Sequence, residues 1–405
     1  MLGKFITSTP PIGGEIKVEA EDFYVEEIAK IDVGSGDYAI IKVKKMNWDT
    51  LRFANVLASR LKISKKRISF AGTKDKRALT VQYFSVYKVG ENELNLKFKD
   101  AEVEFVGYSR KALELGDLVG NKFKIVVRNC KNGELFSKTL NELKEKGTPN
   151  YFGLQRFGVL RYVTHEVGKL LLQKNYEEAF WTYVAKPFEG EDEKVKKIRE
   201  DLWNTRDPRV GLRELPKHLS YERSLLQKLR EGKSELEALL SLPRNLKIMF
   251  IHAYQSYIFN RLLSDRIKDF GNLKEIYRWD YACYLTRENS YFTFKDFSLV
   301  DWNFSRVKRL IAERFAALAL PLVGYDTKLE GWNKKAKEIL SEDNLDLKSF
   351  KNEIKEFSSP GSLRAADMII EITGITFSNC TFSFYLPKGC YGTVLLREFL
   401  KKDVA

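Results

Sequence analysis

The chain of 405 residues has few of the side chains that bind metals or form disulfides. It contains four cysteines, none at C-x-x-C spacing, and three histidines, His165, His218 and His252. A zinc site therefore has almost no ligands at usable spacing, and the cysteines are expected to be buried thiols in a reducing compartment. Cysteine–histidine nucleophilic catalysis stays open, although no local signature supports it.

Long apolar runs and nucleotide-binding loops are also missing. No stretch reaches the length of about 18 apolar residues that a membrane helix needs, and the first residues lack the apolar core of a signal peptide. We therefore expect a soluble, cytoplasmic protein with no membrane partner. The phosphate loop G-x-x-x-x-G-K-[ST] is absent. The stretch "GSGDYA" at 34–39 matches G-x-G-x-x-A, but a β-rich run follows it instead of a helix, which favours a hairpin turn over a dinucleotide site.

Positive charge is what the chain has in excess. Lys and Arg number 69 against 55 Asp and Glu, which gives a net charge of +14. A surplus of this size indicates a polyanionic partner, most often nucleic acid. Hydrophobic residues make up 44% and charged residues 31%, which is typical of a globular protein with a large core.

Strand-like patterns dominate the two ends of the chain, whereas helical periodicity and charge dominate the middle. This predicts an α+β fold in which a discontinuous domain, 1–164 with 359–405, is interrupted by a mostly helical α+β insertion at 165–358. A first helix is predicted within 47–64, with Asp49 or Thr50 as its N-cap. Its apolar face is predicted to contain Leu51, Ala54, Val56, Leu57 and Leu61.

One carboxylate lies in a basic loop between two predicted strands. In "RISFAGTKDKRALTVQYFSV", at 67–86, Asp75 is surrounded by Lys74, Lys76 and Arg77. From the pattern alone a solvated turn is favoured. The alternative is a catalytic acid held where a polyanion binds, because an ionised aspartate can act as a nucleophile or a base without a metal.

Aromatic residues and arginines alternate in "PNYFGLQRFGVLRYV", at 149–163. Unstacked bases need a π surface together with phosphate-binding charge, and this stretch could supply both through Phe152 and Arg156. An aromatic core strand with surface arginines fits the pattern equally well. The stretch "YLPKGCYGTVLLRE", at 385–398, is predicted to form a strand, a turn and a helix.

Six blocks, in order, resemble the TruD family of tRNA pseudouridine synthases. The match is thin between them, at 186–246 and 265–357. The blocks are "KVEAEDFYVEE", "FAGTKDKRALTVQ", "GNKFKIVVRN", "NYFGLQRFG", "AYQSYIFN" and "LPKGCYGTVLLRE".

The resemblance implies a pseudouridine-synthase catalytic fold, a mixed and mainly antiparallel sheet with flanking helices, facing a TRUD insertion across a basic cleft. The implied activity is isomerisation of uridine to pseudouridine in tRNA, at position 13 for the family generally, with no cofactor, metal or obligate protein partner. The alternative is a non-catalytic RNA-binding or RNA-folding protein on the same scaffold. A metal-dependent nuclease would need a carboxylate cluster near the signature, and the sequence has none there.

The resemblance also implies roles for individual residues. Asp75 matches the catalytic aspartate, and Lys17 matches a lysine that pairs with it. Phe23, Asn150 and Phe152 match active-site positions, with Phe152 expected to stack on the target base. Tyr391 falls where some members have Phe. The residues predicted to bind RNA phosphates are Arg60, Lys62, Lys65, Lys66, Arg67, Lys74, Lys76, Arg77 and Arg156.

Overall fold

A mixed sheet of eight strands forms the central feature of the computed structural model, which describes residues 2–158, 160–288 and 290–404. The strand order is β11-β12-β6-β1-β4-β2-β5, with β3 paired beside β4. Within the described residues only β1 and β4 pair in parallel, which confirms the mainly antiparallel sheet. The strands are Phe23–Ala29 (β1), Tyr38–Met46 (β2), Ile68–Phe70 (β3), Leu79–Tyr87 (β4), Ala101–Ser109 (β5), Leu118–Val126 (β6), Thr376–Ser378 (β11) and Thr381–Pro387 (β12).

A second sheet has four strands in the order β10-β9-β7-β8. Its strands are Tyr281–Glu288 (β7), Tyr291–Leu299 (β8), Ala316–Leu322 (β9) and Ser362–Ala365 (β10). The two sheets meet where the Tyr385 hydroxyl on β12 donates a hydrogen bond of 2.9 Å to the Phe292 carbonyl on β8. The strand β10, which lies after residue 358, pairs with β9, which lies before it. The last part of the chain therefore adds a strand to the sheet that the middle of the sequence forms. The division at 164/165 and 358/359 stays a prediction.

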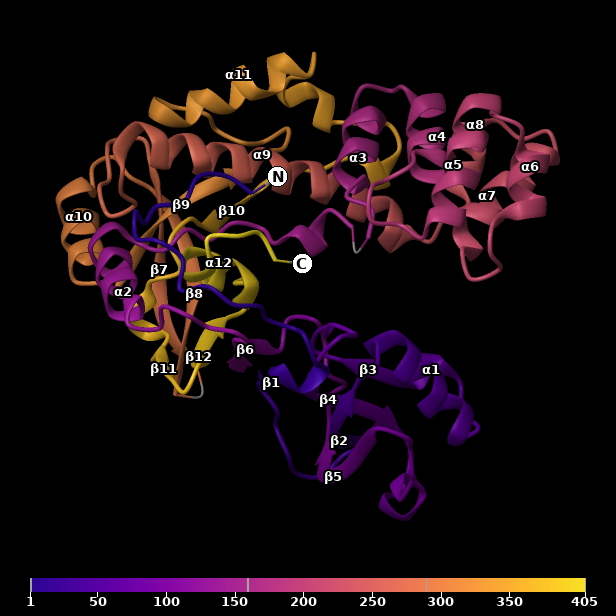
Figure 1. Cartoon of the computed structure of the whole chain (residues 1–405), viewed down its shortest axis with the longest axis horizontal. Coiled ribbons are helices and arrows are strands. Elements are labelled where there is room, and N and C mark those ends of the chain that lie inside the picture. The colour runs from indigo at the N-terminus through magenta and orange to yellow at the C-terminus, as the bar shows by residue number, and fades with distance from the viewer. Residues whose placement is uncertain (1, 159, 289, 405) are drawn as a thin grey trace.

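Helices fill most of the middle of the chain. In Figure 1, α3 to α8 form a group at the upper right, and the long helix α9 runs from that group across the second sheet. No helix in the described residues is both long and apolar enough to cross a membrane. These helices are Thr164–Leu172 (α3), Tyr176–Ala185 (α4), Glu193–Thr205 (α5), Pro208–Glu214 (α6), Ser220–Arg230 (α7), Glu235–Leu240 (α8), Arg244–Phe270 (α9), Phe304–Ala312 (α10) and Lys335–Glu342 (α11).

The helix α1, Thr50–Arg60, covers the part of the sheet formed by β2 and β4. Asp49 caps it, since the side chain accepts a hydrogen bond of 2.9 Å from the Arg52 N–H. The buried face contains Phe53 and Leu57, whereas Leu51 is 47% exposed. The predicted helix and cap are therefore confirmed, but the prediction put Leu51 on the wrong face, because positions 50, 53, 54, 57 and 58 follow the helical period inward.

The predicted hairpin at "GSGDYA" is wrong. The strands β1 and β2 are not neighbours, because β4 lies between them and pairs with both. Residues 34–37 form a loop that passes the end of β5, and Tyr38 and Ala39 begin β2. Gly36 has φ of +157°, and a Cβ there would lie 2.1 Å from the Ser109 carbonyl oxygen, so the close approach to β5 requires glycine.

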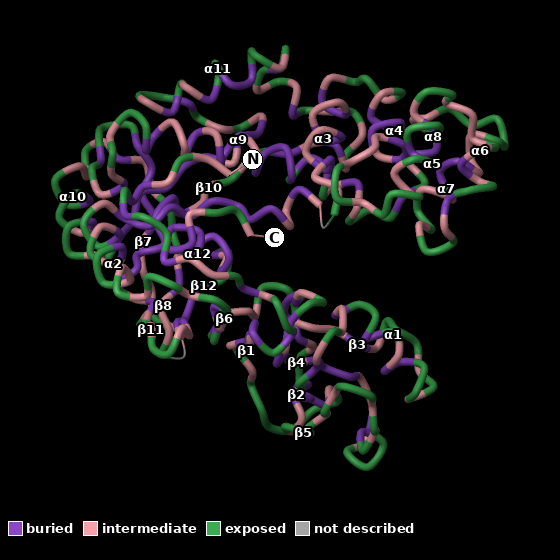
Figure 2. The backbone as a smooth tube through the Cα atoms, in the orientation of Figure 1, coloured by how far each residue is buried: buried purple, intermediate pink, exposed green. Residues whose placement is uncertain are grey.

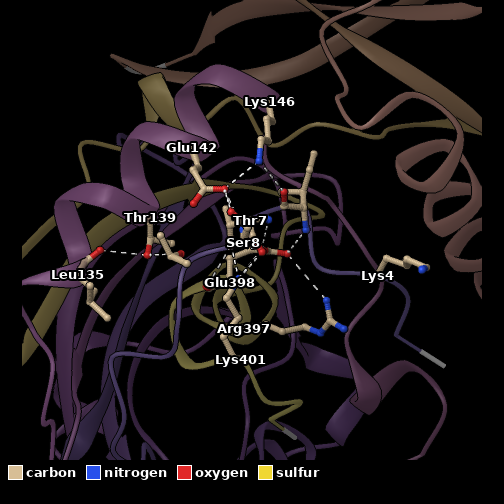
Figure 3. Close-up of polar contacts among 12 residues, drawn as sticks. Lys4, Thr7, Ser8, Leu135, Thr139, Glu142, Lys146, Arg397, Glu398 and Lys401 are labelled. Atoms are coloured by element: carbon tan, nitrogen blue, oxygen red, sulfur yellow. Dashed lines mark hydrogen bonds and ion pairs between the residues drawn. The ribbon is translucent and has the colours of Figure 1, made fainter.

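The N-terminal segment is bound to the last helix of the chain, Gly392–Leu400 (α12), and to Leu135–Lys146 (α2). Figure 3 shows the carboxylate of Glu398 and that of Glu142 facing this segment. Glu398 accepts hydrogen bonds from the Thr7 backbone N–H at 3.2 Å and the Thr7 hydroxyl at 2.7 Å. Glu142 accepts one from the Ser8 N–H at 2.8 Å. Figure 2 shows that the main buried core lies around α9, α12 and the adjoining strands, so the start of α12 is held on a rigid base.

Candidate active site

A cavity of about 310 Å³ lies on one face of the central sheet, beside the Asp75 loop. Side chains alternate between the two faces of a strand, and Phe23 and Val25 on β1 and Asn121 and Phe123 on β6 all point to this face. A larger hollow, of about 860 Å³, lies on the opposite face and contains none of the predicted site residues. The other residues lining the smaller cavity are Gly72, Thr73, Lys74, Asp75, Leu118, Gln155, Gly389, Cys390, Tyr391, Gly392 and Thr393.

Among the residues that the structure describes, Asp75 has two side-chain partners, and both contact the same carboxylate oxygen. The Lys17 Nζ lies 3.3 Å from Oδ2 of Asp75, and the Gln155 Nε2 donates a hydrogen bond of 2.8 Å to that oxygen. Lys17 also lies 4.5 Å from the ring centroid of Phe23, a cation–π contact that fixes the ammonium above β1. Within the described residues, Oδ1 of Asp75 has no hydrogen-bond partner, so one carboxylate oxygen is held twice and the other is not.

The loop that carries Asp75 is tied down on both sides. The backbone N–H of Lys74 donates to the Thr50 hydroxyl at 3.0 Å, and the Gln82 side chain donates to the Gly72 carbonyl at 3.0 Å. The Lys74 ammonium turns inward and pairs with Glu27, whose side chain is fully buried. Asp75 is thus presented from a fixed backbone, which suits a catalytic group.

This pairing corrects one prediction. Lys74 was expected to bind an RNA phosphate, but its side chain is 5% exposed and its charge is neutralised by Glu27. A second buried lysine, Lys45, lies behind the same loop and donates to the Thr80 hydroxyl at 2.9 Å. Burial and the nearby charge of Lys74 lower the pKa of Lys45 to about 8. The positive charge behind Asp75 is therefore partly structural.

The remaining residues predicted to bind phosphates fall into three groups. Arg67 donates to the backbone carbonyls of Tyr87 at 2.9 Å and Lys88 at 2.6 Å, so it fastens the end of β4. Arg156 is partly buried and donates to the Ser256 hydroxyl of α9 at 3.1 Å. The exposed residues of the set, which are open to a polyanion, are Arg60, Lys62, Lys65, Lys66, Lys76 and Arg77.

The four predicted substrate-binding residues lie at different depths. Phe23 and Tyr391 line the cavity. Phe152 is 7% exposed and lies outside the cavity wall that the described residues form, with its ring centroid 6.3 Å from that of Tyr391 and 3.9 Å from the Arg364 Cζ. Asn150 is also buried, and its side chain donates to the Ala365 carbonyl at 2.9 Å. The Tyr391 ring thus lines the cavity, whereas the Phe152 ring packs near it outside the lining.

Three residues at the site were not singled out from the sequence. Gln155 and Asn121 lie inside blocks that carried the resemblance, "NYFGLQRFG" and "GNKFKIVVRN", so their presence near Asp75 could have been anticipated. The 3₁₀ turn Leu154–Arg156 directs Gln155 toward Asp75. Arg364 lies in a stretch with no such block, and only the fold brings it to Phe152.

Comparison with known proteins gives matches that span nearly the whole chain. A family model described as "tRNA pseudouridine synthase D (TruD)" matches residues 2–399. A protein of Archaeoglobus fulgidus named "Probable tRNA pseudouridine synthase D" is 66% identical over 403 residues, which cover 99% of this chain and 98% of that protein. A protein of the same name from Pyrococcus abyssi is 40% identical over 406 residues, covering 98% of each. The crystal structure of the putative tRNA pseudouridine synthase D from Methanosarcina mazei superposes with a TM-score of 0.79 at 35% identity, covering 99% of this chain and 97% of that one.

Proposed function

Because the chain belongs to the TruD family of tRNA pseudouridine synthases, it is an isomerase that converts uridine to pseudouridine in tRNA, and we propose that Asp75 performs this reaction in the cavity of about 310 Å³. The observation that carries the assignment is the arrangement at the Asp75 carboxylate. One oxygen is held by Lys17 and Gln155, and the other has no partner within the described residues. We place the activity in the cytoplasm and the target at position 13.

The reaction breaks the N1–C1′ bond, rotates the uracil and forms a C5–C1′ bond, so no atom is added or lost. The target nucleotide must first leave its stack, at a cost of a few kcal/mol. Stacking on Tyr391 would return about 1–3 kcal/mol. Oδ1 of Asp75 can then attack the sugar or the base, or remove a proton from the sugar. Each route uses the same ionised oxygen and needs no cofactor or metal.

The two partners of Asp75 hold its carboxylate in one orientation for all three routes. The Lys17 Nζ lies 3.3 Å from Oδ2, with the Lys17 side chain 10% exposed and that of Asp75 35% exposed. Gln155 adds a neutral donor that fixes the direction of the carboxylate. The exposed lysines and arginines of the α1–β3 region and of the Asp75 loop would contact the RNA backbone, and that contribution should weaken as salt rises.

The test is an assay on unmodified tRNA made by transcription, in the presence of a chelator. We expect pseudouridine at position 13 and intact strands, and because the isomer has the same mass as uridine, the product is labelled with a carbodiimide before nuclease fragments are examined by mass spectrometry. Asp75→Asn should bind the tRNA with a similar Kd, while product formation falls by about 10³-fold or more. Turnover retained in Asp75→Asn would contradict the role of Asp75. Strand cleavage would indicate a nuclease, and tight binding without product by the wild-type protein would indicate the non-catalytic alternative.

A further inference from the structure

Arg364, near the end of β10, has one edge of its guanidinium group fully used. Its Nη2 donates to the Asn150 side-chain oxygen at 3.0 Å and to the Asn150 carbonyl at 3.2 Å. The guanidinium stacks over the Phe152 ring, with Cζ 3.9 Å from the centroid, and lies 5.9 Å from the centroid of Tyr391. These contacts fix the plane of the group and the direction of its remaining edge.

The other edge of Arg364 faces the wall of the cavity. Nη1 donates no hydrogen bond to any residue that the structure describes. A Cβ on Gly389 would lie 3.5 Å from this nitrogen, and Gly389 is part of the cavity wall beside Tyr391. Arg364 therefore lies next to the cavity wall, beside a wall residue that has no side chain.

Arg364 has no acid beside it within the described residues, whereas three other enclosed arginines of this protein each contact one. Arg199 contacts Glu191 at 3.0 Å, Arg266 contacts Asp280 at 2.7 Å and Arg314 contacts Asp367 at 2.7 Å. Burial lowers the pKa of Arg364, and the charges that act on it include Arg156 but no carboxylate of the described residues. A charge enclosed by protein is costly unless an opposite charge compensates it.

Arg156 is a second arginine whose guanidinium group lies beside the Phe152 ring. Its Cζ lies 5.6 Å from the centroid of the same Phe152 ring. Its Nε donates to the Ser256 hydroxyl at 3.1 Å, and neither Nη atom has a hydrogen-bond partner within the described residues. Burial lowers its pKa as well. The Cζ atoms of both guanidinium groups therefore lie within 5.6 Å of the centroid of one ring, and neither group has an acid beside it in the described residues. Three of their four Nη atoms have no hydrogen-bond partner there.

We propose that Arg364 and Arg156 form a binding site for one phosphodiester group of the RNA backbone, next to the nucleotide whose base enters the cavity. This inference rests on the proposed function, because a uridine that reaches Asp75 brings its flanking phosphates to the rim of the cavity. A phosphate accepts hydrogen bonds from guanidinium groups in fixed geometry. The site would hold the sugar in place while the uracil turns, so Arg364 acts as a positioning residue.

The experiment uses tRNAs assembled by ligation, each with one neutral methylphosphonate in place of a phosphate on either side of the target uridine. With the wild-type protein we expect one of these replacements to reduce kcat/KM by about tenfold or more, as loss of a charge-assisted hydrogen bond does. Arg364→Gln should lose a similar factor on unmodified tRNA, and the methylphosphonate at that position should then cause no further loss. Arg156→Gln should behave in the same way.

The matched control is Arg309→Gln, an exposed arginine on α10 that should keep the full methylphosphonate penalty. If the penalty persists at every position in both Arg364→Gln and Arg156→Gln, the proposal is wrong. Arg156 makes one side-chain hydrogen bond within the described residues, so its variant carries the test if Arg364→Gln fails to fold. If the wild-type protein forms no pseudouridine, the proposed function fails. The Kd values of the wild-type and variant proteins for the same tRNAs then test the phosphate site without relying on activity.

Discussion

The amide group of Gln155 donates a hydrogen bond of 2.8 Å to Oδ2 of Asp75, although the two residues are 80 positions apart. Gln155 belongs to a 3₁₀ turn, Leu154–Arg156, that follows the two buried aromatic residues Tyr151 and Phe152. Asn260 of α9 anchors this segment, because its side-chain oxygen accepts a hydrogen bond of 2.8 Å from the Phe152 N–H. The carboxylate is therefore aligned by a residue that is anchored to the helical part of the molecule.

Replacing Gln155 tests this alignment. We expect Gln155→Leu to reduce kcat by about 10–100-fold, because misplacing a catalytic group by about 1 Å can cost a factor near 10². KM should change little, since the side chain is held by Asp75 in the absence of substrate. Single-turnover assays and Kd measurements separate the two constants. An equal rise in KM, or a fall in Tm with kcat unchanged, would show that Gln155 has only a binding or structural role.

Tyr391 and Phe152 should respond differently to truncation. Tyr391→Ala removes a ring from the cavity wall, so we expect the rate to fall by about tenfold or more, as loss of base stacking does. Phe152→Ala should also lose rate, but in addition it should lower the free energy of unfolding by about 3–5 kcal/mol, because the ring is 7% exposed and packs against Phe259.

Urea unfolding and initial rates, measured on both variants, give the comparison. Tyr391→Phe is the control, and its rate should stay close to that of the wild type. Equal loss of stability in the two alanine variants would contradict the different depths of the two rings. An unchanged rate in Phe152→Ala would remove any role of that ring in catalysis.

The buried pair of Lys74 and Glu27 predicts a strong asymmetry between single and double substitutions. Lys74→Met leaves the Glu27 carboxylate buried without its cation, which should cost about 3–5 kcal/mol of stability. Combining it with Glu27→Leu removes both charges, and most of that loss should be recovered. Urea unfolding of the two singles and the double provides a full thermodynamic cycle. A double variant no more stable than Lys74→Met would show that the pair is not the source of the loss.

Glu142 gives a prediction about pH. Burial acts to raise the pKa of this carboxyl, but the Lys146 ammonium and the Ser8 donors outweigh it and lower the pKa from 4.5 to about 2. Because the folded pKa is below the unfolded one, the stabilisation is present above the unfolded value and is lost as the pH falls toward about 2. The Glu142 carboxylate accepts a hydrogen bond from Ser8 of the N-terminal segment, so its protonation should weaken the contact between that segment and α2.

We expect Glu142→Gln to lower Tm at pH 7 by about 1–2 °C, a value typical of a partly exposed ion pair. The difference from the wild type should disappear near the folded pKa. Glu145→Gln, on the exposed side of the same helix, is the control and should leave Tm unchanged at both pH values. A difference that grows as the pH falls would contradict the sign derived for Glu142.

Local patterns predicted the elements well where the signal lies within one stretch of chain. The helix α1 and its Asp49 cap follow from periodicity and capping alone. The hairpin at 34–39 failed because strand pairing depends on partners far along the chain. The strand β4 inserts between β1 and β2, and nothing in the turn itself reports that.

The site shows the same limit. The resemblance pointed to Asp75 and Lys17, and the structure brings their side chains within 3.3 Å. Lys74 could not be separated from its exposed neighbours Lys76 and Arg77, because its inward direction depends on Glu27 of β1. Arg364 was missed for a similar reason, since its surroundings come from Asn150, Phe152 and Gly389. Sequence spacing does not report contacts of this kind.

The place of β12 in the sheet sets an order for folding during synthesis. β6 pairs on one side with β1, which the ribosome makes early, and on the other with β12, which begins at Thr381. Until the last part of the chain leaves the ribosome, one edge of β6 has no partner, and open edges promote pairing between chains. The cavity wall at Gly389–Thr393 also comes from these final residues. A chain that stops before Thr381 would thus expose an edge strand and lack part of the cavity wall, so the site can assemble only after residues 381–393 have been made.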